Sequence, residues 1–132
     1  MPLTYNDAIN KAKTINATLI YDDDTYNLHY NYATENAEDS TDVINHEVWF
    51  TDAATTFNIL RFSDEFPTAG TALWRLGSED QRIWKFYNRS LSNASLQQDP
   101  FNFDSLKTIP VVPSVGFQGE GEVLDIIYSP QP

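Results

Sequence analysis

The chain contains no cysteine among its 132 residues. Disulfides, thiolate zinc sites and cysteine nucleophiles are therefore excluded. The chain also lacks any apolar run close to the roughly 18 residues that a membrane-spanning helix needs. Its first residues do not show the basic-then-apolar layout of a signal peptide. We therefore expect an intracellular product without a membrane partner.

Basic residues are scarce: 8 Lys and Arg stand against 19 Asp and Glu, and the net charge is −11. Residues 1–60 hold ten carboxylates and two lysines, whereas residues 61–132 hold nine carboxylates and six bases. An acidic surface repels phosphate backbones, so direct binding of nucleic acid is not expected. The partners that suit this charge are proteins with basic patches, copies of the chain itself, or neutral ligands.

The common catalytic motifs are missing as well. The chain has no P-loop, no glycine-rich dinucleotide fingerprint ahead of a helix and no G-x-S-x-G nucleophile elbow. Among 19 acids some carboxylate pair always lies at the separation that glycoside hydrolysis needs, so such a pair is not evidence for that reaction. We predict that the protein is not an enzyme and uses no cofactor.

The only histidines, His29 and His46, fall on consecutive expected strands. Two histidines and a carboxylate such as Glu47 are the ligands of many metal sites. Alternation along a strand, however, directs Glu47 to the face opposite His46. We therefore interpret both histidines as polar surface residues.

The three aspartates at 22–24 raise the question of calcium, which binds several carboxylate oxygens. An EF-hand loop needs Gly at its sixth position and Glu at its twelfth, where this chain has Asn27 and Ala33. We interpret the three aspartates as an acidic turn and predict no metal.

What the chain does contain is typical of a globular, β-rich protein. Hydrophobic residues make up 41% of the chain and aromatic residues 14%, and aromatic residues favour strands. At this length we expect a single domain with one core, over residues 1–132.

A helix is predicted at residues 4–14. Thr4 and Asp7 have the spacing of a capping box at its start. Apolar residues then recur on one helical face. These residues are Tyr5, Ala8, Ile9 and Ala12.

From residue 17 to residue 89 the pattern predicts a meander of three antiparallel hairpins. The clearest alternation lies at 25–33, where three tyrosines and a leucine share one face. The acidic segment 34–42 reads as a solvated loop. The paired segments are 17–21 with 25–33, 43–50 with 56–62, and 71–76 with 81–89.

The last third of the chain is less regular. Residues 90–107 are predicted as an irregular loop and residues 122–128 as a final strand. Between them, the Pro- and Gly-rich segment 108–121 is expected to be an extended arm, because proline cannot donate to a strand ladder. The fold predicted is mainly β (α+β by count): an N-terminal helix followed by a seven- to eight-stranded antiparallel β-sandwich or small barrel.

The tryptophans Trp49, Trp74 and Trp84 are interpreted first as fillers of this β core. Their alternative role is to stack on sugars or on partner proteins. In the third expected hairpin Trp84 and Phe86 share one face, and the opposite face is apolar too. One of these faces is expected to meet another subunit.

Together these observations favour a structural or interaction protein, a subunit of a larger assembly whose partners are other protein subunits and copies of itself. The specific hypothesis is a small virion component for capsid decoration or for tail or neck assembly, located in the virion or the cytoplasm. The alternatives are an acidic DNA mimic that inhibits a nucleic-acid-binding protein, and a carbohydrate-binding β-sandwich. The residues expected at the assembly interface are Trp84, Phe86, Val111, Val112, Val115 and Phe117.

Overall fold

The computed structural model describes residues 2–110 and 123–125. Its main sheet has three antiparallel strands in the order β1-β2-β3, and a short β4-β5 pair forms a second sheet. The strands are β1 Ile20–Asp22, β2 Asn27–Glu35, β3 Val43–Phe50, β4 Thr108–Pro110 and β5 Val123–Asp125. The helices are α1 Tyr5–Thr14, α2 Ala53–Asp64 and α3 Asn93–Gln98, with 3-10 turns η1 Gln81–Lys85 and η2 Phe103–Leu106.

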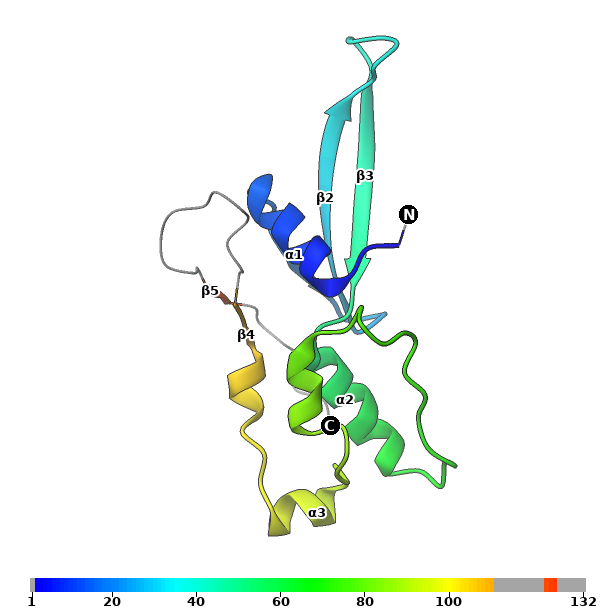
Figure 1. Ribbon diagram of the computed structural model, residues 1–132, viewed down its shortest axis with the longest axis vertical. Helices are drawn as coiled ribbons and strands as arrows, with labels where there is room; N and C mark the ends of the chain where they lie inside the picture. The colour runs from blue at the N-terminus through cyan, green and yellow to red at the C-terminus, as the bar shows by residue number, and fades with distance from the viewer. Residues whose placement is uncertain (1, 111–122, 126–132) are drawn as a thin grey trace.

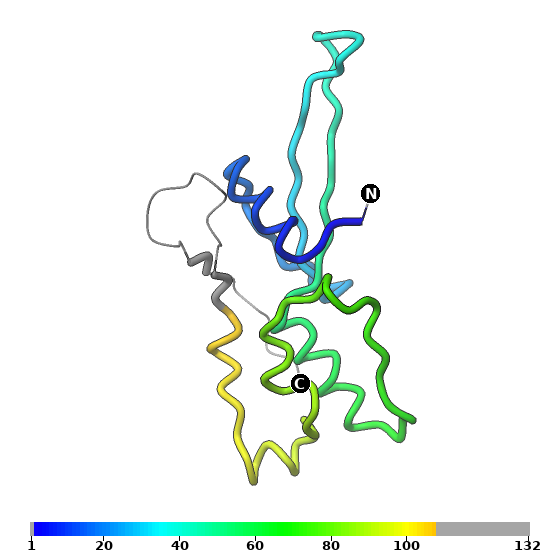
Figure 2. The backbone as a smooth tube through the Cα atoms, viewed as in Figure 1, coloured from blue at the N-terminus to red at the C-terminus, as the bar shows by residue number. Residues whose placement is uncertain are grey.

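The β2-β3 hairpin is the longest feature of the molecule and projects beyond α1, which lies beside its lower half (Figure 1). Below the hairpin lie α2, η1 and α3. The chain leaves α2 and returns toward the hairpin through an extended segment, residues 66–78, before it reaches η1 (Figure 2). The core lies where α1, the lower hairpin, α2 and η1 meet.

The predicted N-terminal helix is present as α1. The Thr4 hydroxyl accepts from the backbone N–H of Asp7 at 3.1 Å, and the Asp7 side chain accepts from the Thr4 backbone, which completes a capping box. The apolar face predicted from the sequence is the buried one. Its residues are Tyr5, Ala8, Ile9 and Ala12.

The hairpin buries one face only, and only in its lower half. Leu28 and Tyr30 on β2 are fully buried, opposite Phe50 and Val48 on β3. The Tyr30 hydroxyl donates to the backbone C=O of Ala8 at 2.8 Å, which ties the sheet to α1. In the upper half, β2 continues to Glu35, and the loop that follows is shorter than the predicted 34–42 segment.

The second predicted hairpin is wrong in its second half, because residues 56–62 belong to helix α2. Asp52 caps this helix: its carboxylate accepts from the N–H of Thr55 at 2.9 Å. Ala53, Phe57 and Leu60 then recur at helical spacing and are buried. The β-branched residues of this segment suggest a strand, but a cap and a helical apolar stripe outweigh that weak preference.

The third predicted hairpin does not exist. Residues 71–76 form no strand, and residues 81–85 are the 3-10 turn η1. Gly70 and Gly77 have φ angles of 141° and 89°, values that disfavour other residues. Ile83, inside η1, is buried against the core.

The described chain is therefore a small α+β fold with an open three-stranded sheet, and the predicted sandwich or barrel of seven to eight strands is wrong. Residues 90–107, predicted to be irregular, contain α3 and η2. Of the predicted arm and final strand, only 108–110 and 123–125 are described. Within the described residues, no helix has the length and apolar character needed to cross a membrane.

Candidate protein-interaction surface

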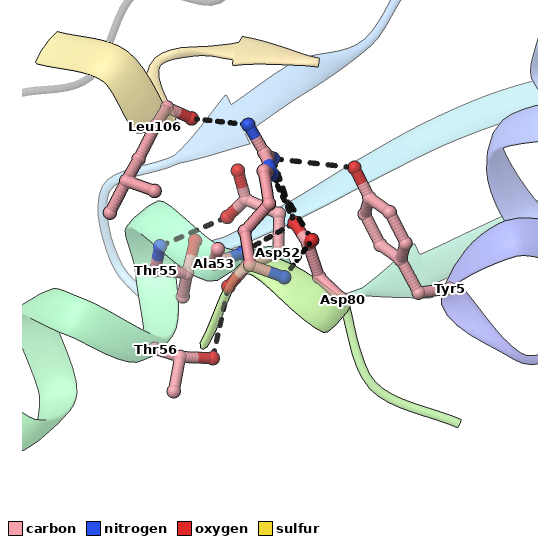
Figure 3. Close-up of polar contacts among 8 residues, drawn as sticks. Tyr5, Asp52, Ala53, Thr55, Thr56, Asp80 and Leu106 are labelled. Atoms are coloured by element: carbon pink, nitrogen blue, oxygen red, sulfur yellow. Dashed lines mark hydrogen bonds and ion pairs between the residues drawn. The ribbon is translucent and has the colours of Figure 1, made fainter. Parts of the chain in front are cut away.

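A polar network lies inside the molecule where its elements converge (Figure 3). The Arg82 guanidinium binds the Asp80 carboxylate, with Nη2 2.7 Å from Oδ2 and Nε 3.1 Å from Oδ1. It also donates to the backbone C=O of Leu106 at 3.4 Å and to the Tyr5 hydroxyl at 3.5 Å. One side chain thus connects α1, η1 and η2.

Two buried carboxylates in this network stand at the N-terminus of α2. Asp80 accepts from the N–H of Ala53 at 2.9 Å, and Asp52 accepts from the N–H of Thr55. Both aspartates are nearly inaccessible to solvent. The free N–H groups of a helix N-terminus favour nearby negative charge, so the network also fixes the start of α2.

The network raises the pKa values of Tyr5 and Arg82. Burial raises the pKa of Tyr5 above its ordinary value, and the charge of Asp80 raises it further. Burial alone lowers the pKa of Arg82, but the hydrogen bond and charge of Asp80 outweigh burial and raise it. A permanently charged guanidinium with its carboxylate partner stabilises the fold and offers no proton donor or nucleophile near neutral pH. We assign the network a structural role.

Next to this network lies an open groove of about 610 Å³. It runs between α2, the base of β3 and the extended segment 66–78. We call it the tryptophan groove. The apolar lining residues on the solvent side of the groove are 41–95% exposed, whereas its core side is closed by buried residues such as Phe50 and Ile83. Exposed lining residues are Leu3, Trp49, Ile59 and Trp74.

All three tryptophans lie at the surface, so the interpretation as core fillers is wrong for them. Trp74 is 95% exposed, Trp49 44% and Trp84 43%. The Trp49 ring stacks on His29 with centroids 4.3 Å apart. Trp84 contacts Tyr87, a residue of the groove lining, edge to face. Large exposed aromatic side chains are common at the centre of protein interfaces and costly to leave in water.

The structure separates the residues predicted for the interface. Trp84 is on the surface, and its Nε1 donates to the Glu79 carboxylate at 3.3 Å. Phe86 is fully buried and packs edge to face on Phe57, with centroids 5.2 Å apart, so it belongs to the core. The other four predicted residues lie outside the described part of the chain. These are Val111, Val112, Val115 and Phe117.

The histidines do not converge. His29 stands opposite Trp49 and His46 opposite Tyr32 in the β2-β3 register, which places them on opposite faces of the hairpin. Glu47 shares the face of His29, with 3.7 Å between Oε1 and Nδ1. In the described ranges no three His, Asp or Glu side chains are grouped to hold a metal ion.

The aspartates at 22–24 lie at the end of β1 and in the turn that leads to β2. Asp22 accepts from the backbone N–H and the hydroxyl of Thr25, and the hydroxyl hydrogen bond is the main cause that lowers the pKa of Asp22. The Asp22 carboxylate therefore stabilises the turn through its hydrogen bonds.

Sequence reasoning missed Ile59 and Trp74 as surface residues. A signal was present for Trp74, because Pro67, Gly70 and Gly77 mark residues 66–78 as a loop, and a tryptophan in a loop has few neighbours to cover it. The exposure of Ile59 could be recognised only once residues 53–64 were assigned to helix α2. Comparisons with protein-family models, with curated proteins and with solved structures find no match for this chain.

Proposed function

We propose that the protein is a non-enzymatic interaction subunit that binds another protein through the tryptophan groove. The observation that carries this proposal is the concentration of exposed apolar side chains around one groove, with Trp74 95% exposed at its edge. Exposed apolar side chains gathered at one place mark interaction sites, whereas those scattered singly are normal. Tryptophan is also enriched among the residues that dominate binding energy.

The chemistry of the groove supports an apolar protein segment as its occupant. The uncovered side chains come from four separate parts of the chain. They are Leu3, Trp49 on β3, Ile59 on α2 and Trp74. The polar groups beside them, such as those of Asp80, are already hydrogen-bonded within the protein. An occupant therefore gains mainly by removing apolar area from water, about 25 cal/mol for each Å².

The specific hypothesis within this class is a virion component for capsid decoration or tail assembly. It is supported by the lack of catalytic motifs in the sequence and by the exposed apolar surface. The third hairpin with two apolar faces, which also favoured it, is absent.

The test is affinity capture with the tagged full chain in cells that produce it, with Trp74→Ser as the variant. Leu76→Ser is the matched control, because Leu76 is 72% exposed in the same segment but does not line the groove. We expect the wild type and the control to capture the same protein partner. The Trp74→Ser variant should capture at least tenfold less of it. Equal capture by all three chains would contradict the groove as binding site.

The identity of the captured protein distinguishes the finer hypotheses. Capsid or tail proteins support the virion hypothesis. A nuclease or repressor that is released by salt supports the acidic inhibitor instead, because screening weakens contacts between charges. A signal on a glycan array, lost in Trp74→Ser, supports the carbohydrate-binding alternative.

A further inference from the structure

The outer edge of β3 carries little of the protection that sheet edges usually have, since Glu47 is its one acidic residue. In the described residues β3 pairs with β2 alone, over eight consecutive residue pairs without a bulge. Its sequence, VINHEVWF, contains no Lys, Pro or Gly. Native sheets use lysine, proline, bulges or very short strands to prevent an edge from pairing with another chain. The edge is therefore suited to accept a further strand.

The side chains along this edge are apolar and exposed on both faces of the hairpin. Ile44 is 42% exposed on the face that α1 covers only lower down. Val43 is 54% exposed and Trp49 44% exposed on the other face. A strand added to this edge would bury these side chains in addition to pairing the backbone.

We propose that this added strand is β3 of a second copy of the chain, paired antiparallel about a two-fold axis at His46. The two three-stranded sheets then form one continuous sheet. A two-fold axis perpendicular to a sheet brings residues of the same face opposite each other, so it lies midway between the two copies of one residue. The axis at His46 places Ile44 opposite Val48 of the second copy, and Val43 opposite its Trp49.

The neighbouring registers are less favourable. An axis at Glu47 brings the two Glu47 carboxylates opposite each other, and directly opposed like charges destabilise a sheet. An axis at Asn45 leaves Val48 and Trp49 opposite the acidic loop of the second copy, so their apolar surface stays exposed. Only the axis at His46 matches apolar with apolar residues on both faces.

Charge determines the direction of the pairing. The hairpin tip carries four carboxylates and no basic residue between positions 35 and 42. Parallel pairing would bring two such tips together, whereas antiparallel pairing sends them to opposite ends of the dimer. Because each copy has a net charge of −11, added salt should strengthen the dimer. A basic partner would show the reverse dependence.

The first test uses the absence of cysteine from the chain, so that one introduced cysteine is its only thiol. Directly opposed residues of antiparallel strands have Cα atoms about 4.5–5.5 Å apart, within the range of a disulfide. We expect His46→Cys to form a disulfide-linked dimer under mild oxidation at least tenfold faster than Asn45→Cys or Glu47→Cys. Faster reaction at either neighbour would overturn the register, and equal reaction at all three would overturn the pairing.

The second test measures the mass of the cysteine-free protein by light scattering at low and high salt. We expect a dimer at high salt, and a monomer for Ile44→Lys under the same conditions. Ile20→Lys is the matched control: it makes the same charge change at an apolar residue that is 43% exposed on β1, and it should remain a dimer. A wild-type protein that stays monomeric at high salt would refute the proposed pairing.

The β3 edge and the tryptophan groove share Trp49, but Ile44 and Trp74 each belong to only one of them, so variants at these two residues separate the two proposals. Trp74→Ser should abolish capture of the partner and leave the dimer intact. Ile44→Lys should abolish the dimer and leave the groove residues Ile59 and Trp74 in place. A Trp74→Ser chain that also loses the dimer would contradict the assignment to the β3 edge.

Discussion

Arg82 links three elements of the fold, α1, η1 and η2, through one side chain. Its guanidinium binds the carboxylate of Asp80, which in turn holds the N-terminus of α2, and it reaches Tyr5 and Leu106. Removal of one partner from a buried ion pair is costly because the other charge stays buried without compensation.

We predict that Arg82→Ala lowers the free energy of unfolding by about 3–5 kcal/mol. The control is Lys107→Ala, which breaks the 2.8 Å Lys107–Asp104 ion pair, whose side chains are 41% and 80% exposed. That loss should be about 1 kcal/mol or less. Urea unfolding followed by circular dichroism gives both values, and similar losses for the two variants would refute the role assigned to Arg82.

Tyr30 gives the stability of the protein a dependence on alkaline pH. Burial is the main cause that raises the pKa of Tyr30, to about 12, from about 10 in an unfolded chain. The folded state therefore holds this proton more tightly. Its contribution to the free energy of unfolding is complete below about pH 10 and is lost as the pH rises toward about 12.

We expect the urea midpoint to fall between about pH 10 and about pH 12. Tyr30→Phe should be less stable near neutral pH, because the hydrogen bond to the Ala8 C=O is lost, and its midpoint should fall less steeply in this window. The same slope in variant and wild type would show that Tyr30 does not cause the dependence.

At the scale of elements, α2 is the segment that decides the fold. Read as a strand, residues 56–62 would extend the sheet; as a helix they close the core and end the sheet at β3. Thr55, Thr56 and Ile59 are β-branched and favour strands locally. The Asp52 cap and the buried stripe through Phe57 outweigh this preference.

The two phenylalanines of α2 test this assignment. Phe57 is 3% exposed and contacts Phe86, whereas Phe62 is 68% exposed. We predict that Phe57→Ala lowers the free energy of unfolding by about 3–5 kcal/mol. Phe62→Ala, the same change on the same helix, should alter it by about 0.5 kcal/mol or less. Equal losses, measured by urea unfolding, would contradict the described orientation of α2.

At the scale of the whole molecule, excess negative charge opposes the folded state. The net charge is −11, and compact folding brings like charges together. Salt shortens the range of this repulsion, from about 30 Å at 0.01 M to about 3 Å at 1 M.

We therefore predict that the melting temperature rises with sodium chloride over this range. The variant Asp24→Lys with Glu38→Lys changes the net charge from −11 to −7 at two exposed loop positions. It should show a smaller rise in melting temperature, measured by calorimetry. An equal rise in both proteins would mean that salt acts through apolar hydration rather than through charge.

The sequence did not predict the tryptophan groove as a site. Of the interface residues that it did suggest, Trp84 lies at the surface outside the groove lining, whereas Phe86, two residues later, is in the core. In a strand these two residues share a face, but in the 3-10 turn and the bend that follows it they point apart. The error in the site therefore follows directly from the error in the element.

The sequence by itself determined the elements whose signals are local. The capping box and apolar stripe of α1 lie within ten residues, and the alternation of β2 specifies its buried face. Tertiary structure alone decided what depends on distant segments. Ala53 and Asp80 are 27 positions apart, and the groove unites Leu3, Ile59 and Trp74. No local pattern encodes such contacts, because they form only once burial of the common core has brought those segments together.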